Sequence, residues 1–208
     1  MTPARLRGLY AITDENLIPE SAFVASIEQA LSGGVSIIQY RDKSGSETKR
    51  LEQASALRSL CNEYRASLII NDDITLAKAV AADGVHLGED DVSIEQARLM
   101  LGDDAIIGVS CYNQLQRAIE AQTSGADYVA FGAVFASPTK PNARSASCGL
   151  IREAKSQLEI PVCAIGGIDK SNVAQVIDSG ADMTALISSL FSAADIRLTA
   201  KHISKLFD

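Results

Sequence analysis

The sequence has only two histidines, and its four cysteines lie far apart. The cysteines lack the paired spacing of a zinc site or a redox motif, so we expect them to be reduced. His86 lies inside a predicted strand and His202 inside the last predicted helix, which argues against a catalytic triad and a histidine-rich metal site. No cysteine has a base beside it in the sequence pattern, so a covalent nucleophile is also disfavoured.

Basic residues and long apolar runs are scarce as well. The chain has 19 Lys and Arg against 26 Asp and Glu, a formal charge of −7, whereas a nucleic-acid binder needs a basic face. No long apolar run follows the basic residues at positions 1–9, so neither a signal peptide nor a membrane span is predicted. We expect a cytoplasmic protein with small-molecule partners, and whether it forms a homo-oligomer stays open.

The sequence is organised as a regular alternation of two patterns. Short β-branched runs are each followed by a stretch with apolar residues at helical spacing, which is typical of repeated βα units. The predicted strands span residues 8–13, 36–40, 67–71, 84–87, 105–110, 128–135, 161–165 and 183–188. The predicted helices lie near residues 20–32, 46–65, 74–81, 93–101, 113–124, 149–157, 170–179 and 192–206.

Eight similar units predict an α/β fold, a (β/α)₈ TIM barrel, as a single domain over residues 1–208. This length is near the lower end for such a barrel. An open doubly wound sheet is the alternative, but no Gly-x-Gly-x-x-Gly follows the first predicted strand. Small residues with an aspartate recur before the strands, as in Ala82-Asp83-Gly84, Gly125-Ala126-Asp127 and Gly180-Ala181-Asp182, and close one unit before the next.

Charged residues follow the predicted strands, at the end where barrel enzymes carry their chemistry. After the second strand, Gln39, Arg41 and Lys43 alternate and would share one face. Carboxylates follow the third and fourth strands, in Asn71-Asp72-Asp73 and Gly88-Glu89-Asp90-Asp91. Carboxylates together with phosphate oxygens suit Mg²⁺, and Arg and Lys bind the remaining phosphate charge. The mixture predicts a site for a diphosphate and its metal, with surface salt bridges as the alternative.

A second anion site is predicted at the last two strands. Gly166-Gly167 follows the seventh strand, and Ile187-Ser188-Ser189 ends the eighth. Glycines let backbone amides approach a phosphate, and barrels commonly bind phosphate here. A tight turn is the alternative reading of the glycine pair.

Several stretches are together specific for one known family. They run nearly from end to end: Leu9-Tyr10-Ala11-Ile12-Thr13-Asp14, Gln39-Tyr40-Arg41-Asp42-Lys43, Ile70-Asn71-Asp72-Asp73, Ala82-Asp83-Gly84-Val85-His86-Leu87-Gly88, Ile107-Gly108-Val109-Ser110, Thr139-Lys140 and Ala164-Ile165-Gly166-Gly167-Ile168. In these stretches the chain resembles the thiamine phosphate synthase family. It departs from the family pattern at Tyr112, Ala133, Pro138 and Met183.

The resemblance implies a Mg²⁺-dependent transferase that displaces diphosphate from a pyrimidine methylene by a thiazole nitrogen. The implied contacts to hydroxymethylpyrimidine diphosphate are Gln39, Arg41, Lys43, Asn71, Ser110 and Lys140, of which Arg41, Lys43, Ser110 and Lys140 are also the implied catalytic residues. The implied contacts to thiazole phosphate are Ser137, Thr139, Gly167, Ile187 and Ser188. Asp72 and Asp91 are the implied Mg²⁺ ligands, with Asp90 as the alternative to Asp91.

Three other functions remain as alternatives. A thiazole tautomerase would share the fold and the thiazole phosphate site but not the diphosphate and metal site. A sugar-phosphate epimerase or isomerase would use the carboxylates as bases and leave Arg41 and Lys43 without a purpose. A catalytically silent barrel would bind thiazole phosphate and regulate a partner.

Overall fold

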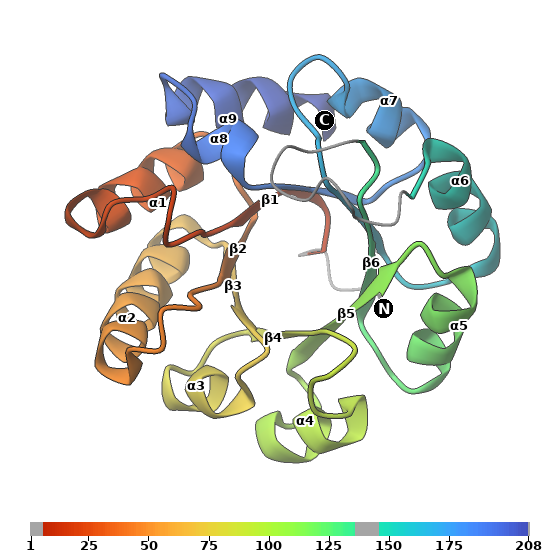
Figure 1. Cartoon of the computed structure of the whole chain (residues 1–208), viewed down its shortest axis with the longest axis horizontal. Helices are drawn as coiled ribbons and strands as arrows, with labels where there is room; N and C mark the ends of the chain where they lie inside the picture. Colours follow the sequence, from red (N-terminus) through yellow and green to blue (C-terminus); the bar gives the residue numbers. More distant parts are fainter. Residues whose placement is uncertain (1–5, 136–145, 208) are drawn as a thin grey trace.

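Eight parallel strands form a closed barrel in chain order, as predicted (Figure 1). The structure is a computed structural model, and it describes residues 6–135 and 146–207. Every strand pairs with its neighbours in the chain, and β8 pairs with β1 to close the barrel. The strands are β1 Gly8–Ile12, β2 Ile37–Tyr40, β3 Ser67–Asn71, β4 Gly84–Leu87, β5 Ile106–Tyr112, β6 Tyr128–Phe131, β7 Val162–Ile165 and β8 Met183–Leu186.

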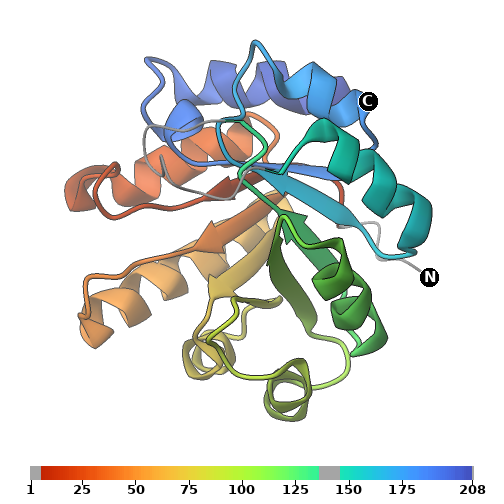
Figure 2. The same cartoon turned by 45° about the vertical axis from the view of Figure 1, so that its right-hand side comes forward.

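The helices form a ring outside the barrel (Figures 1 and 2). They are η1 Glu20–Ala22, α1 Phe23–Ser32, α2 Glu47–Tyr64, α3 Ile74–Ala79, α4 Ile94–Leu101, α5 Leu115–Thr123, α6 Cys148–Gln157, α7 Val173–Asp178, α8 Ser188–Phe191, α9 Ile196–Ser204 and η2 Lys205–Phe207. None of those within the described residues combines the length and the apolar character needed to cross a membrane.

Three predicted strands are too long at their C-terminal ends, the first by one residue, since β1 ends at Ile12. The sixth ends at Phe131, although Val134 and Phe135 still donate backbone hydrogen bonds to the end of β7. The eighth ends at Leu186, and Ser188 instead begins the short helix α8, which the sequence did not predict.

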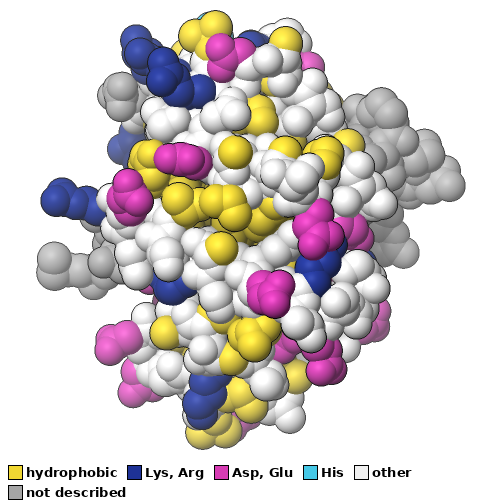
Figure 3. All heavy atoms as spheres, turned by 90° about the vertical axis from the view of Figure 1, so that its left-hand side faces the viewer, with side chains coloured by type: hydrophobic (Ala, Val, Ile, Leu, Met, Phe, Trp, Pro, Cys, Tyr) yellow, Lys and Arg dark blue, Asp and Glu magenta, His cyan; other side chains and the backbone are white. Residues whose placement is uncertain are grey.

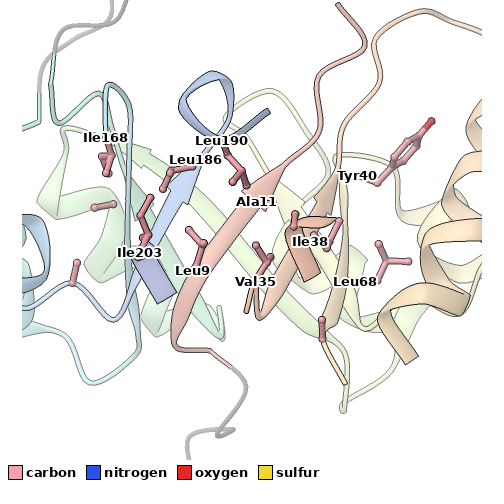
Figure 4. Close-up of a cluster of buried hydrophobic side chains, with 14 of the residues drawn as sticks. Leu9, Ala11, Val35, Ile38, Tyr40, Leu68, Ile168, Leu186, Leu190 and Ile203 are labelled. Atoms are coloured by element: carbon pink, nitrogen blue, oxygen red, sulfur yellow. The ribbon is translucent and has the colours of Figure 1, made fainter. Parts of the chain in front are cut away.

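Alternate strand residues separate the core into an inner and an outer part. Tyr10, Ile37 and Ile69 belong to the cluster inside the barrel. Their neighbours point outward and pack with the helices. Those drawn in Figure 4 include Leu9, Ala11, Ile38, Leu68 and Leu186. Both faces of each strand are therefore buried, which explains the nearly continuous apolar runs in the sequence.

The surface mixes both signs of charge. On the described part of the face drawn in Figure 3, acidic and basic side chains are scattered among apolar ones, without a continuous basic stripe. This distribution fits the net charge of −7.

Three aspartates at the N-terminal ends of the strands explain the repeated small-residue turns. Each directly precedes an even-numbered strand, and its Oδ2 accepts a backbone N–H from the preceding odd-numbered strand at 2.7 Å. The pairs are Asp83 with Leu68, Asp127 with Ile107, and Asp182 with Val162. The same oxygens pair with a cation from a helix, at 2.7 to 2.8 Å: Arg58, Arg98 and Lys155 respectively. These contacts clamp adjacent strands at the end of the barrel away from the predicted site.

We predict that Asp127→Ala lowers the free energy of unfolding by about 1–3 kcal/mol, because it leaves the buried Ile107 N–H without its acceptor. Asp127→Asn keeps an acceptor oxygen and should cost less. Urea denaturation measures both, with the exposed Asp104→Ala as the control. Equal stability of Asp127→Ala and the control would contradict the clamp.

Candidate active site

Two carboxylates and a lysine meet at the carboxyl ends of β2, β3 and β4. Lys43 Nζ lies 2.6 Å from Asp72 Oδ2, and the two side chains are 54% and 27% exposed. Asp91 Oδ2 accepts the Gly88 N–H at 2.6 Å. Partial burial raises the pKa of Asp91, and interaction with the Asp72 carboxyl raises it further, while the Gly88 N–H and Lys43 act in the opposite direction. The Asp72 carboxyl is therefore close enough to Asp91 to disfavour the charged form of Asp91.

The backbone around Asp72 is held in an unusual conformation. Asp72 has a φ of 63°, in the left-handed region that side chains other than glycine seldom adopt. Its N–H donates to the carbonyl of His86 at 2.9 Å, which fastens the end of β3 to β4. Such a conformation persists where surrounding contacts hold it, and it is often found at functional sites.

The neighbouring acidic residues have other partners or lie elsewhere. Asp73 accepts the Leu76 N–H at the start of α3 and pairs with Arg50. Asp42 pairs with Lys49 at 2.8 Å. Asp90 is exposed, whereas Asp91 is half-buried beside Asp72. The geometry thus favours Asp91 over Asp90, the alternative that the sequence left open.

The donor set fits a magnesium ion. No cluster of three or more His, Cys, Asp or Glu that could hold a metal occurs in residues 6–135 and 146–207. Mg²⁺ does not need such a cage, since it keeps several waters and is bound by one or two carboxylates together with substrate phosphates. Asp72 and Asp91 are the residues that would hold it.

A cavity of about 280 Å³ lies beside Asp72, between the loops that follow β2 and β3. Lys43, Asn71 and Asp72 line it, together with Arg50 and Asp73. It extends outward from the mouth, towards α2 and α3. Three further predicted contacts of the same substrate, Gln39, Arg41 and Ser110, are not among its lining residues, and neither is Asp91. The predicted site therefore combines this hollow with the mouth of the barrel.

Arg41 follows β2 directly. Its N–H donates to the hydroxyl of Thr13 at 2.8 Å, and the same hydroxyl donates to the Arg41 carbonyl at 3.0 Å. This reciprocal pair fixes the backbone at the ends of β1 and β2. The Arg41 guanidinium forms no ion pair with any residue that the structure describes.

A chain of hydrogen bonds inside the barrel joins two predicted site residues. Gln39 Nε2 donates to the Tyr10 hydroxyl at 2.7 Å, and the hydroxyls of Tyr10 and Tyr128 lie 2.8 Å apart. His86 Nδ1 lies 2.9 Å from the Tyr128 hydroxyl, and its Nε2 lies 2.9 Å from Ser110 Oγ. The sequence pattern predicted that His86 lies in a strand but indicated no function for it. In β4 it lies between Val85 and Leu87, two apolar residues that pack with Ala97 of α4, and this alternation is the signal that it points inward.

Burial keeps the members of this chain neutral. It lowers the pKa of His86 to about 4, and it raises the pKa of the Tyr10 and Tyr128 hydroxyls. At neutral pH the imidazole is therefore uncharged and has one donor and one acceptor nitrogen.

Arg117 braces the ends of β4 and β5. Its Nε donates to the Ser110 carbonyl at 2.8 Å, and its Nη2 donates to the Gly88 carbonyl at 3.3 Å. The guanidinium carbon also lies 5.8 Å from the ring centroid of Tyr112. The sequence pattern did not single out this residue, because its contacts depend on which face of α5 turns towards the ends of β4 and β5.

The other predicted anion site lies at β7 and β8. Gly166 and Gly167 have φ values of 101° and 63°. A Cβ at Gly166 would lie 2.6 Å from Ala133 Cα, so only glycine fits there without a shift. Ser189 Oγ donates to the Ile168 carbonyl at 2.6 Å, which ties α8 to the loop after β7.

Ile187 precedes helix α8. Ser188 is the first residue of α8 and not, as predicted, the end of a strand. The first N–H groups of a helix have no acceptor within it, so Ser188 remains compatible with a phosphate contact. Ser137, Thr139 and Lys140 lie outside the described residues.

The site can be compared with known proteins. Residues 9–190 match the family described as "Thiamine monophosphate synthase". The chain belongs to this family. A thiamine-phosphate synthase from Nitrosococcus oceani is 53% identical over 195 residues, which cover 94% of this chain and 90% of that protein. One from Thioalkalivibrio sulfidiphilus is 48% identical over 207 residues, covering 100% and 98%. The predicted synthase family and its transferase class are confirmed.

Solved structures agree with the thiamine monophosphate synthase fold. A thiamine phosphate pyrophosphorylase from Pyrococcus furiosus is 39% identical, with a TM-score of 0.89 over 98% of this chain and 96% of that one. A 3-hexulose-6-phosphate synthase has a TM-score of 0.70 over 97% and 100% of the two chains. At 17% identity it shares the fold alone.

Proposed function

We propose that this chain makes thiamine phosphate by joining hydroxymethylpyrimidine diphosphate to thiazole phosphate, with release of diphosphate and with Mg²⁺ at Asp72 and Asp91. The observation that carries the proposal is the pair of adjacent carboxylates with Lys43 beside them. A divalent cation stabilises two adjacent carboxylates, and a lysine next to them can bind a phosphate oxygen.

The proposed reaction breaks one C–O bond and forms one C–N bond. The bond from the pyrimidine methylene to the diphosphate breaks with both electrons on the oxygen, and the thiazole nitrogen supplies its lone pair to the resulting cation-like carbon. No proton has to be removed, so the reaction needs leaving-group stabilisation rather than a strong base. Mg²⁺, when bound, would supply positive charge to the departing diphosphate.

Side chains of the protein would bind the negative charge of the diphosphate that Mg²⁺ does not neutralise. Arg41 and Lys43 follow β2, and Asn71 ends β3 beside them. Arg41 is free of ion pairs within the described residues and can bind two phosphate oxygens at once. Lys43 is more than half exposed and can exchange Asp72 for a phosphate oxygen. Lys140 is the third proposed cation.

The thiazole phosphate would bind on the opposite side of the mouth. The proposed contacts are Gly167 in the loop after β7, and Ile187 and Ser188 at the start of α8. Barrels commonly bind a phosphate in this region. Ser137 and Thr139 are the further proposed contacts. Both substrates are phosphorylated metabolites, so we place the reaction in the cytoplasm.

The alternative functions explain less of the site. A thiazole tautomerase would need no diphosphate and would leave the Lys43, Asp72 and Asp91 cluster without a ligand. A sugar-phosphate isomerase needs a general base, and Asp91 with Asp72 could serve, but Arg41 would then have no purpose. A silent binder would not need a pair of carboxylates suited to a metal.

We predict that Asp72→Asn and Asp91→Asn each lower kcat by about 10²-fold or more, since losing one such electrostatic contact typically costs a few kcal/mol. Thermal unfolding should change little, because both side chains lie at the mouth rather than in the core. Product formation is measured with and without Mg²⁺, and the exposed Asp90→Asn is the matched control. Normal Mg²⁺-dependent turnover in both variants would refute the metal site.

Lys43→Ala should weaken binding of the pyrimidine diphosphate by about tenfold or more, because it removes a cation from the proposed leaving group. Binding of thiazole phosphate should stay within about twofold. Calorimetry with each substrate in the presence of Mg²⁺ separates the two effects, and Lys78→Ala on the exposed face of α3 is the control. An equal loss for both substrates would contradict two separate anion sites.

A further inference from the structure

The hydrogen-bonded chain across the barrel interior has a direction. Three of its four contacts join two groups that can each act as donor or acceptor, the fourth begins at Gln39 Nε2, which can only donate, and only one hydrogen can occupy each contact. Gln39 Nε2 donates to the Tyr10 hydroxyl, and the arrangement in which every hydroxyl of the network both donates and accepts has Tyr10 donating to Tyr128. Tyr128 then donates to His86 Nδ1. The donor at one end therefore decides the role of every group that follows.

The direction also fixes the two ends. A neutral imidazole that accepts at Nδ1 carries its hydrogen on Nε2, so it donates to Ser110 Oγ. The Ser110 hydroxyl hydrogen is then left to donate to a bound molecule. At the other end, Gln39 uses an N–H inside the barrel and keeps its Oε1 as an acceptor.

The hydrogen-bonded network fits inside the barrel only because β5 has a glycine at position 108. A Cβ at Gly108 would lie 2.0 Å from Tyr128 Cζ and 2.4 Å from its hydroxyl oxygen. The ring of Tyr128 can therefore lie across the barrel only because β5 has a glycine opposite it. The imidazole of His86 stacks on the same ring, with centroids 5.6 Å apart, and the Tyr10 ring meets it edge-on at 6.1 Å. All three side chains are buried.

We propose that Tyr10, Tyr128 and His86 are positioning residues that set the hydrogen-bonding polarity of the mouth, with Ser110 as the donor and Gln39 as the acceptor towards the substrate. The matching ligand is an aromatic ring that turns a nitrogen lone pair towards β5 and an N–H towards β2. An aminopyrimidine has both groups. The inference rests on the proposed function, since it assigns the pyrimidine ring as the group that Ser110 and Gln39 recognise.

The tautomer of His86 tests the direction of the chain without any assay of activity. The protein has only two histidines, so ¹⁵N NMR of the histidine-labelled protein gives two sets of signals, and His202→Asn assigns them. At pH 7 we expect His86 to be neutral with its hydrogen on Nε2. A hydrogen on Nδ1, or an imidazolium, would overturn the proposal. This readout stands even if no thiamine phosphate is formed, so it separates failure of the inference from failure of the proposed function.

Substrate discrimination tests the role of the chain in recognition. Tyr128→Phe removes the central hydroxyl and frees both ends to reorient. We expect its KM for hydroxymethylpyrimidine diphosphate to rise about tenfold, the effect of about one hydrogen bond, with the KM for thiazole phosphate unchanged. The preference of the wild type for this substrate over its analogue without the amino group should fall by a similar factor. Tyr10→Phe should act in the same direction.

The controls distinguish positioning from general loss of structure. Tyr64→Phe removes a tyrosine hydroxyl on α2, outside the barrel, and should leave both KM values and the preference unchanged. Thermal unfolding shows whether Tyr128→Phe and Tyr10→Phe remain folded. If the folded variants lost activity equally towards the substrate and its deaminated analogue, the chain would have only a structural role and the proposal would be wrong.

Discussion

The close approach of Asp72 and Asp91 is the constraint on which the site depends. The Asp72 carboxyl raises the pKa of Asp91 on the neighbouring strand's loop, and Lys43 offsets only part of this effect. The backbone does not avoid this contact. Asp72 has a left-handed backbone conformation, and its N–H donates to the His86 carbonyl of β4. Asp91 accepts the Gly88 N–H. These contacts hold the two carboxylates near each other. Such an arrangement is stable and useful when a divalent cation and a phosphate enter together.

Aspartates have different roles at the two ends of the barrel. At the N-terminal ends of the strands, aspartates are fully used by a backbone N–H and a helix cation, as Asp127 is by Ile107 and Arg98. At the carboxyl ends, the aspartates of the site face each other. The same residue type is therefore structural at one end and poised for a ligand at the other, and the difference lies in the partners that the fold provides.

Much of this could be predicted from the sequence, because barrel topology and residue order are tightly linked. Alternating patterns predicted eight strands, and the position of Asp72 and Asp91 after adjacent strands predicted that they would meet. Local patterns could not resolve contacts between distant elements. Helix α8 is only four residues long, too short for periodicity to reveal, so Ser188 was placed in a strand. His86 gained its partners, Tyr128 and Ser110, only when β4, β5 and β6 closed around it.

The most direct test of the account is a crystal structure with Mg²⁺ and inorganic diphosphate. The account predicts a metal about 2.0–2.1 Å from an oxygen of both Asp72 and Asp91, with diphosphate oxygens completing its coordination and Lys43 turned from Asp72 to the diphosphate. Diphosphate bound with its metal on other groups, or an empty mouth at saturating concentrations of both, would contradict it.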